Sequence, residues 1–132
     1  MKIAISSMGK DLDSQIDPRF GRCQYFILVD PETLAFEAVG NEGLMASGGA
    51  GVQAAQLIAQ RGATVLITGN IGPNAESALS ASGIKIYLAS GGTVKDVIQG
   101  YKTGSLRETS GATVPPHSGM GGGRGMGGRR GS

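Results

Sequence analysis

The chain has 132 residues, of which 39% are hydrophobic and 17% are charged, and its formal net charge is +2. This length and composition fit one globular domain, and no apolar run approaches the roughly 18 residues of a membrane span. A single cysteine excludes an intramolecular disulfide framework, and residues 1–7 lack the apolar core of a signal peptide, so we expect a cytoplasmic protein.

Short apolar runs bounded by turn residues predict β-strands in the first third of the chain. Residues 2–6 form the first run, and residues 24–30 form a second that concentrates aromatic and β-branched side chains. Residues 30–33 (Asp-Pro-Glu-Thr) have turn chemistry, and residues 34–39 have the composition of a returning strand. We therefore expect a central strand, a long loop over residues 7–22 and a β-hairpin.

The middle of the chain predicts alternating helices and strands. Apolar residues recur at helical spacing over residues 52–61, where Gly62 supplies a stop, and an apolar strand follows over residues 63–68. A second helix over residues 75–82 has Pro73 near its start. A strand over residues 84–88 and a helix over residues 94–101, with Thr93 as its N-cap, complete the pattern.

Consecutive strand-loop-helix units imply parallel strands joined by right-handed crossovers. We therefore predict an α/β fold with a mixed five-stranded sheet, order 3-2-1-4-5, in which strand 2 is antiparallel. The first strand is then a topological switch point, and ligands of open α/β sheets bind beyond the carboxyl ends of the parallel strands. Loops 6–22, 69–74 and 89–93 should converge there.

Residues 104–132 differ in composition from the predicted domain, residues 1–103. They are rich in Gly, Arg and Met and have almost no large apolar side chains, so we expect a flexible tail. The only histidine, His117, lies in this tail. Its arginine-glycine segments resemble those that track nucleic-acid backbones, but it has no aromatic residues to stack on bases. Nucleic acid is therefore not the expected partner.

The converging loops predict an anion site. Loops 69–74 and 89–93 are rich in glycine and precede helices, so they can direct backbone N–H groups and helix dipoles at an anion. Arg19 and Arg22 would add positive charge, and Cys23 would offer a thiolate if these neighbours lower its pKa. Together these groups indicate an anionic ligand with an affinity for sulfur.

Each of these signals has a simpler interpretation. A lone cysteine is more often a small buried hydrophobic residue than a ligand. The two arginines can instead be solvated or paired with Asp11, Asp13 or Asp17. Glycine loops before helices are also common as ordinary turns.

Catalysis is not expected. Residues 1–103 have no histidine, so neither a Ser-His-Asp nor a Cys-His constellation can form there. A two-metal nuclease needs carboxylates at strand ends, whereas the predicted strands end in Ser6-Ser7 and in Thr68-Gly69. We therefore predict a binding protein rather than an enzyme.

Residues 17–26 (Asp-Pro-Arg-Phe-Gly-Arg-Cys-Gln-Tyr-Phe), with Gly-Asn-Ile-Gly at 69–72 and residues 89–94, resemble the dinitrogenase iron-molybdenum cofactor biosynthesis family. That family includes NifX-like proteins and the C-terminal domain of NifB. The resemblance implies a ribonuclease-H-like, three-layer α/β/α fold. It also implies that the chain binds or carries an iron-sulfur, iron-molybdenum or molybdenum-copper cluster for cofactor assembly. We expect cluster donor and acceptor proteins as its partners, and a monomer or weak homodimer.

The chain departs from the family at one loop. Many members have a histidine before the first helix, but residues 44–51 contain none, and Met45 and Ser47 are poor substitutes for imidazole as iron ligands. Ligation then depends on Cys23, or passes to a second subunit. The cofactor-binding residues implied are Arg19, Phe20, Gly21, Arg22, Ser47, Gly48, Gly69, Asn70, Gly91 and Gly92, with Cys23 as the metal ligand. The alternative is a regulatory or scaffolding domain with a small-anion site and a basic tail that contacts a partner or nucleic acid.

Overall fold

The computed structural model describes residues 1–41 and 49–109. The predicted site residues Ser47 and Gly48, and also His117, lie outside the described residues. The elements in chain order are β1 (Ile3–Ser7), the 3-10 helix η1 (Phe20–Arg22), β2 (Tyr25–Val29), β3 (Phe36–Gly40), α1 (Ala50–Gln60), β4 (Val65–Thr68), α2 (Pro73–Ala81), β5 (Lys85–Leu88), α3 (Val94–Lys102) and β6 (Arg107–Thr109). None of the helices in the described ranges has the length and apolar character needed to cross a membrane.

The strands form one mixed sheet of six, in the order β3-β2-β1-β4-β5-β6. Strand β4 is parallel to both β1 and β5, whereas β2 is antiparallel to both β1 and β3. The predicted order of the first five strands and the antiparallel direction of β2 are therefore confirmed.

The predicted number of five strands is wrong, because β6 adds a sixth. It pairs antiparallel with β5, with Arg107 opposite Leu88 and Thr109 opposite Ile86. This strand lies in the segment that the sequence assigned to the flexible tail. Its three residues, Arg-Glu-Thr, are too few and too polar to show the alternation by which a half-buried strand is recognised.

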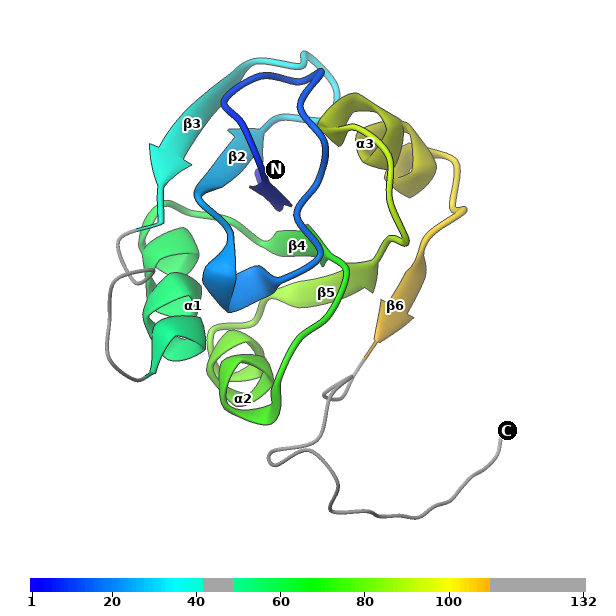
Figure 1. Cartoon of the computed structure of the whole chain (residues 1–132). Coiled ribbons are helices and arrows are strands. Elements are labelled where there is room, and N and C mark those ends of the chain that lie inside the picture. The colour runs from blue at the N-terminus through cyan, green and yellow to red at the C-terminus, as the bar shows by residue number, and fades with distance from the viewer. Residues whose placement is uncertain (42–48, 110–132) are drawn as a thin grey trace.

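The sheet lies between two helical layers: α1 and α2 cover one face, and α3 covers the other (Figure 1). Side chains alternate between the two faces of a strand, so β1 contributes to both layers. Ala4 packs in the core cluster that includes α1 and α2, whereas Ile3 and Ile5 pack in the cluster that includes α3. The architecture is thus a three-layer α/β fold.

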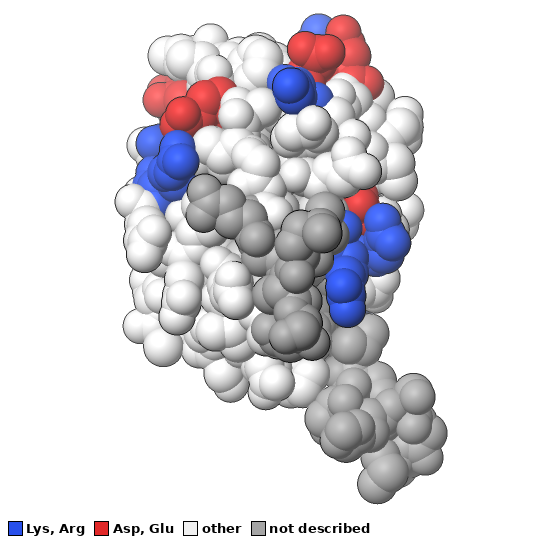
Figure 2. Space-filling view, turned by 60° about the vertical axis from the view of Figure 1, so that its left-hand side comes forward, with Lys and Arg blue, Asp and Glu red and all other residues white. Residues whose placement is uncertain are grey.

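Surface charge is sparse on the side of the molecule where α1 and β3 come forward. Figure 2 shows Lys and Arg there in small, separate groups that have acidic residues beside them, with uncharged surface between the groups. Positive charge on this face is therefore supplied by a few individual side chains.

Candidate functional site

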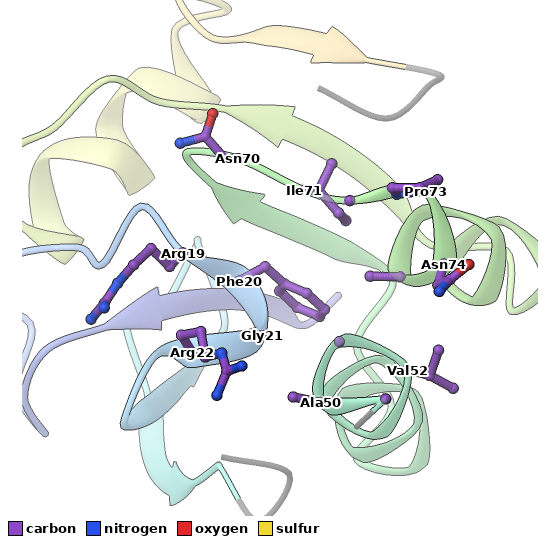
Figure 3. A pocket seen from close by; sticks show the side chains of 14 residues that line it. Arg19, Phe20, Gly21, Arg22, Ala50, Val52, Asn70, Ile71, Pro73 and Asn74 are labelled. Atoms are coloured by element: carbon purple, nitrogen blue, oxygen red, sulfur yellow. The ribbon is translucent and has the colours of Figure 1, made fainter. Parts of the chain in front are cut away.

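A cavity of about 810 Å³ lies where η1 meets the first turns of α1 and α2 (Figure 3). It is lined by residues 19–22, 49–52 and 70–75, and no Asp or Glu is among them. The apolar side chains of Phe20, Val52 and Ile71 contribute to the same lining. The cavity thus combines positive charge with partly apolar walls.

The loop before η1 is fastened to the ends of β1 and β4. The amide of Asp17 donates to the carbonyl of Ser6 at 2.9 Å, and the amide of Asn70 donates to the carbonyl of Pro18 at 2.7 Å. On the other side, the amide of Ile16 donates to the carbonyl of Gly92 at 3.0 Å. The predicted convergence of the three loops is confirmed.

Glycines allow η1, α1 and α2 to pack closely around the cavity. A Cβ atom on Gly21 would lie 3.1 Å from the backbone N and Cα atoms of Gly51. A Cβ atom on Gly51 would in turn lie 3.0 Å from the Cβ atom of Ala75 in α2. Larger residues at positions 21 and 51 would therefore push these elements apart.

Helices α1 and α2 both begin at the cavity. Their N-cap residues are Gly49 and Gly72, so neither cap residue has a side chain that could accept from the first amides of its helix. First-turn amides have no partner within their own helix, and they sit at the positive end of the helix dipole. As far as the described residues go, two helix N-termini are therefore available to an anion in the cavity.

Helix α3 differs, because its N-terminus is already satisfied. Thr93 and Asp96 form a reciprocal capping box, and hydrogen bonds from the backbone amide and the side chain of Thr93 hold the pKa of Asp96 below its usual value. The next two amides, of Val94 and Lys95, donate to the carbonyls of Ser14 and Leu12.

Gly91 and Gly92 precede this capped helix, and neither lines the cavity at η1. The structure therefore does not bring these two predicted site residues together with the arginines. Gly69 also lies outside that lining, whereas its neighbour Asn70 belongs to it.

Arg19 is engaged by a buried carboxylate. Asp17 is 2% exposed, and its two carboxylate oxygens accept from Nε and Nη2 of Arg19 at 3.1 Å each. Burial opposes ionisation of Asp17, but the hydrogen bonds and charge of Arg19 outweigh it and hold the pKa of this carboxyl below its usual value. The structure thus supports the interpretation that Arg19 pairs with Asp17.

Arg22 is the less committed of the two arginines. It is exposed, and none of the described carboxylates lies within 4.0 Å of it. In Figure 3 the Arg22 side chain lies near Ala50 at the start of α1, whereas that of Arg19 extends away from the two helices. Arg22 is therefore the positive side chain best placed to meet an anion.

Cys23 is buried in the core and does not line the cavity. Its side chain is 0% exposed, and its thiol donates to the carbonyl of Phe20 at 3.3 Å. Burial, reinforced by the charge of Asp17, raises the pKa of Cys23 to about 12. The condition for a thiolate at Cys23, a pKa lowered by the arginines, is not met, because desolvation of the thiolate outweighs the charge of Arg19.

We expect Cys23 to react with iodoacetamide at pH 8 at least about a hundredfold more slowly in the native protein than in the unfolded chain, because only the thiolate is nucleophilic. Mass spectrometry of the alkylated chain measures both rates. The sequence has a single cysteine, so the unfolded chain in guanidinium provides the matched control. Equal rates in the two states would contradict the buried, protonated thiol.

Asn41 does not line the cavity but supports the η1 backbone that does, and the sequence analysis missed it. It is buried, and its Nδ2 donates to the carbonyls of Gly21 at 3.2 Å and Cys23 at 2.8 Å. These carbonyls flank Arg22, so Asn41 fixes the backbone that carries the exposed cation. The contact joins residues 18 and 20 positions apart, and no local sequence pattern signals it.

Within residues 1–41 and 49–109, no group of three or more His, Cys, Asp or Glu side chains is placed to hold a metal ion. The chemistry that the described residues offer at the cavity is therefore hydrogen bonding and positive charge.

Comparison with known proteins gives one family and several structural relatives. The model of the family described as "Dinitrogenase iron-molybdenum cofactor" matches residues 1–104. The apo form of the orange protein from Desulfovibrio gigas is 42% identical with a TM-score of 0.81, over 85% of this chain and 95% of that chain. A candidate NifB protein from Thermotoga, assigned to the DUF35 family, is 38% identical with a TM-score of 0.75, over 85% and 96% of the two chains. An uncharacterised protein from Methanocaldococcus jannaschii is 30% identical over 112 residues, which are 82% of this chain and 95% of the relative.

Proposed function

The chain belongs to the dinitrogenase iron-molybdenum cofactor family, and from that premise we propose that it binds an anionic metal-sulfur cluster as cargo for cofactor assembly or delivery. The observation that carries the proposal is the cavity at η1. Two helices begin there with glycine N-caps, Arg22 adds an exposed cation, and no carboxylate of residues 1–41 or 49–109 contributes to the lining.

The lining fits the chemistry of such a cargo. Cluster sulfurs accept hydrogen bonds from amide N–H groups, and these bonds tune the properties of iron-sulfur clusters in proteins. The amides of the first turns of α1 and α2 can supply such bonds without offering a metal ligand. Iron-sulfur, iron-molybdenum and molybdenum-copper clusters share this sulfur surface, so the fit applies to all three.

Capture through charge and hydrogen bonds suits a carrier, because a cargo held in this way is released without breaking a metal-ligand bond. A bond from Cys23 would require the thiol either to leave the core or to lose its proton within it, where burial raises the pKa to about 12. The proposed mode of binding therefore uses no bond to Cys23. The ribonuclease-H-like assignment, the exchange with donor and acceptor proteins and the lack of catalysis stay predictions.

Anaerobic loading tests the proposed function. The full chain and its Cys23→Ala variant are incubated with iron and sulfide, or with tetrathiomolybdate and copper, and are then desalted. Metal analysis and visible spectra measure the retained cargo. We expect the wild type to retain a stoichiometric, coloured cluster from at least one mixture and the Cys23→Ala variant to retain the same amount.

Two other results would change the account. If both proteins emerge colourless and free of metal, the proposed function is wrong, and the small-anion or scaffolding alternative becomes the better interpretation. If only the Cys23→Ala variant loses the cargo while its melting temperature is unchanged, the cluster is tethered by the thiolate.

A further inference from the structure

Strand β3 forms one edge of the sheet, because it pairs with β2 alone (Figure 1). An edge strand presents a row of unpaired backbone groups, and proteins usually protect such a row with lysine, proline, a β-bulge or a covering segment. The five residues of β3 (Phe-Glu-Ala-Val-Gly) include neither lysine nor proline, and the register of all five with β2 is continuous. As far as residues 1–41 and 49–109 show, the edge of β3 is open.

Every second residue of β3 directs its backbone groups outward, because alternate residues of an antiparallel pair turn their N–H and C=O groups toward the partner strand. On one side of β3, the amide of Asp30 donates to the carbonyl of Ala35 at 2.9 Å. On the other side, the amide of Asn41 donates to the carbonyl of Gln24, also at 2.9 Å. Odd-numbered residues thus face β2, and the residues that face the open edge are Phe36, Ala38 and Gly40.

The side chains along this edge are complementary to those of a second copy of the strand. Phe36 is 43% exposed, whereas a Cβ atom added to Gly40 would meet nothing within 4 Å. Both lie two positions from Ala38, so two copies of β3 that pair antiparallel about Ala38 place Phe36 opposite Gly40 of the partner subunit. An aromatic ring opposite a glycine covers backbone that the glycine leaves exposed, which stabilises the pairing.

Charge does not oppose this pairing. Glu37 is the only charged residue of β3, and its carboxylate lies 3.8 Å from the guanidinium of Arg61. In the register centred on Ala38, Glu37 faces Val39 of the partner subunit, so no two carboxylates lie directly opposite each other. The charged groups visible on this side of the molecule are also few and separate (Figure 2).

We propose that β3 is a dimer interface, at which a second copy of the chain pairs its own β3 antiparallel about a two-fold axis at Ala38. The two six-stranded sheets then form one continuous sheet. Strand β3 runs parallel to β1, since both are antiparallel to β2, so the two cavities at η1 lie at opposite ends of the joined sheet. The inference concerns the assembly of the chain and does not rest on the proposed function.

Sedimentation velocity of the full chain, between about 5 and 500 µM, tests the inference. An interface of two five-residue strands is small, so we expect a dissociation constant of about 50 µM, with monomer at the low concentration and dimer at the high one. Amide hydrogen exchange in NMR spectra locates the contact. The amides of Phe36, Ala38 and Gly40 should become protected only at the high concentration.

Two variants should weaken the dimer at least about tenfold. Phe36→Lys removes the ring and adds a charge to the edge. Ala38→Pro removes the central outward amide but no hydrogen bond to β2, as proline on an edge strand allows. The matched control is Met8→Lys, because Met8 is a large apolar residue outside β3 that is 53% exposed, and this variant should dimerise like the wild type.

The inference is overturned if the wild type stays monomeric over the whole range. It is also overturned if a dimer forms without protection of the three outward amides, or if it persists unweakened in folded Phe36→Lys. Melting temperatures check folding, and exchange in the wild type decides if a variant is unfolded. These measurements need no metal, so their failure is distinguishable from failure of the proposed function.

Discussion

Arg22→Glu is expected to lower the affinity for a metal-sulfur anion by about tenfold to a hundredfold, because it replaces an attractive charge at the cavity by a repulsive one. Arg22 is exposed and has no described carboxylate within 4.0 Å, so the folded structure does not depend on its charge. Anaerobic titration with tetrathiomolybdate measures the affinity, and thermal unfolding checks that the variant is folded.

Two variants serve as controls for this prediction. Lys95→Glu changes the net charge by the same amount away from the cavity and should leave the affinity unchanged. Arg22→Lys keeps the charge but loses the planar fork of donors, so an intermediate affinity is expected. Unchanged affinity in folded Arg22→Glu would show that the anion does not bind at η1.

Gly69→Ala is expected to lower the free energy of unfolding by about 2–4 kcal/mol, through overpacking against backbone that cannot easily move. The added Cβ atom would lie 2.6 Å from Cβ and 2.7 Å from Cα of Pro18. Relief by separation is opposed, because the next residue, Asn70, donates its amide to the carbonyl of the same proline. Urea unfolding followed by circular dichroism measures the loss.

The matched control is Gly40→Ala at the end of β3, where an added Cβ atom would meet nothing within 4 Å. We expect its stability to stay within about 0.5 kcal/mol of the wild type. If Gly69→Ala unfolds at the same urea midpoint as Gly40→Ala, the prediction is wrong. The loop before η1 would then pack less tightly against the end of β4 than it does in the structure.

The order of the helices and strands could be predicted because apolar periodicity and turn residues indicate the same element boundaries along most of the domain. Gly62 and Gly83, which have φ values of +87° and +76°, end α1 and α2 close to the predicted positions. The polar strand β6 has no such pattern, since its place depends on pairing with β5. It could be found only from the three-dimensional structure.

The meeting of the loops around the candidate site could be predicted, but their detailed contacts could not. Topology alone brings the loops together, yet the sequence leaves open whether Arg19 is free, and only the structure shows its pairing with Asp17. Only the structure shows that the thiol of Cys23 is buried and donates to the carbonyl of Phe20 in η1. By contrast, the spacing of Thr93 and Asp96 is a readable capping-box signal that α3 satisfies its own first amides.

The most direct test of the central claim is a titration of the isotope-labelled full chain with tetrathiomolybdate, followed by backbone amide chemical shifts in NMR spectra. The account predicts that the largest shifts fall on Arg22 and on the first-turn amides at residues 50–52 and 74–75. The capped amides at residues 93–96 should stay unchanged. Binding with shifts confined to other parts of the chain would contradict an anion site at the two helix N-termini.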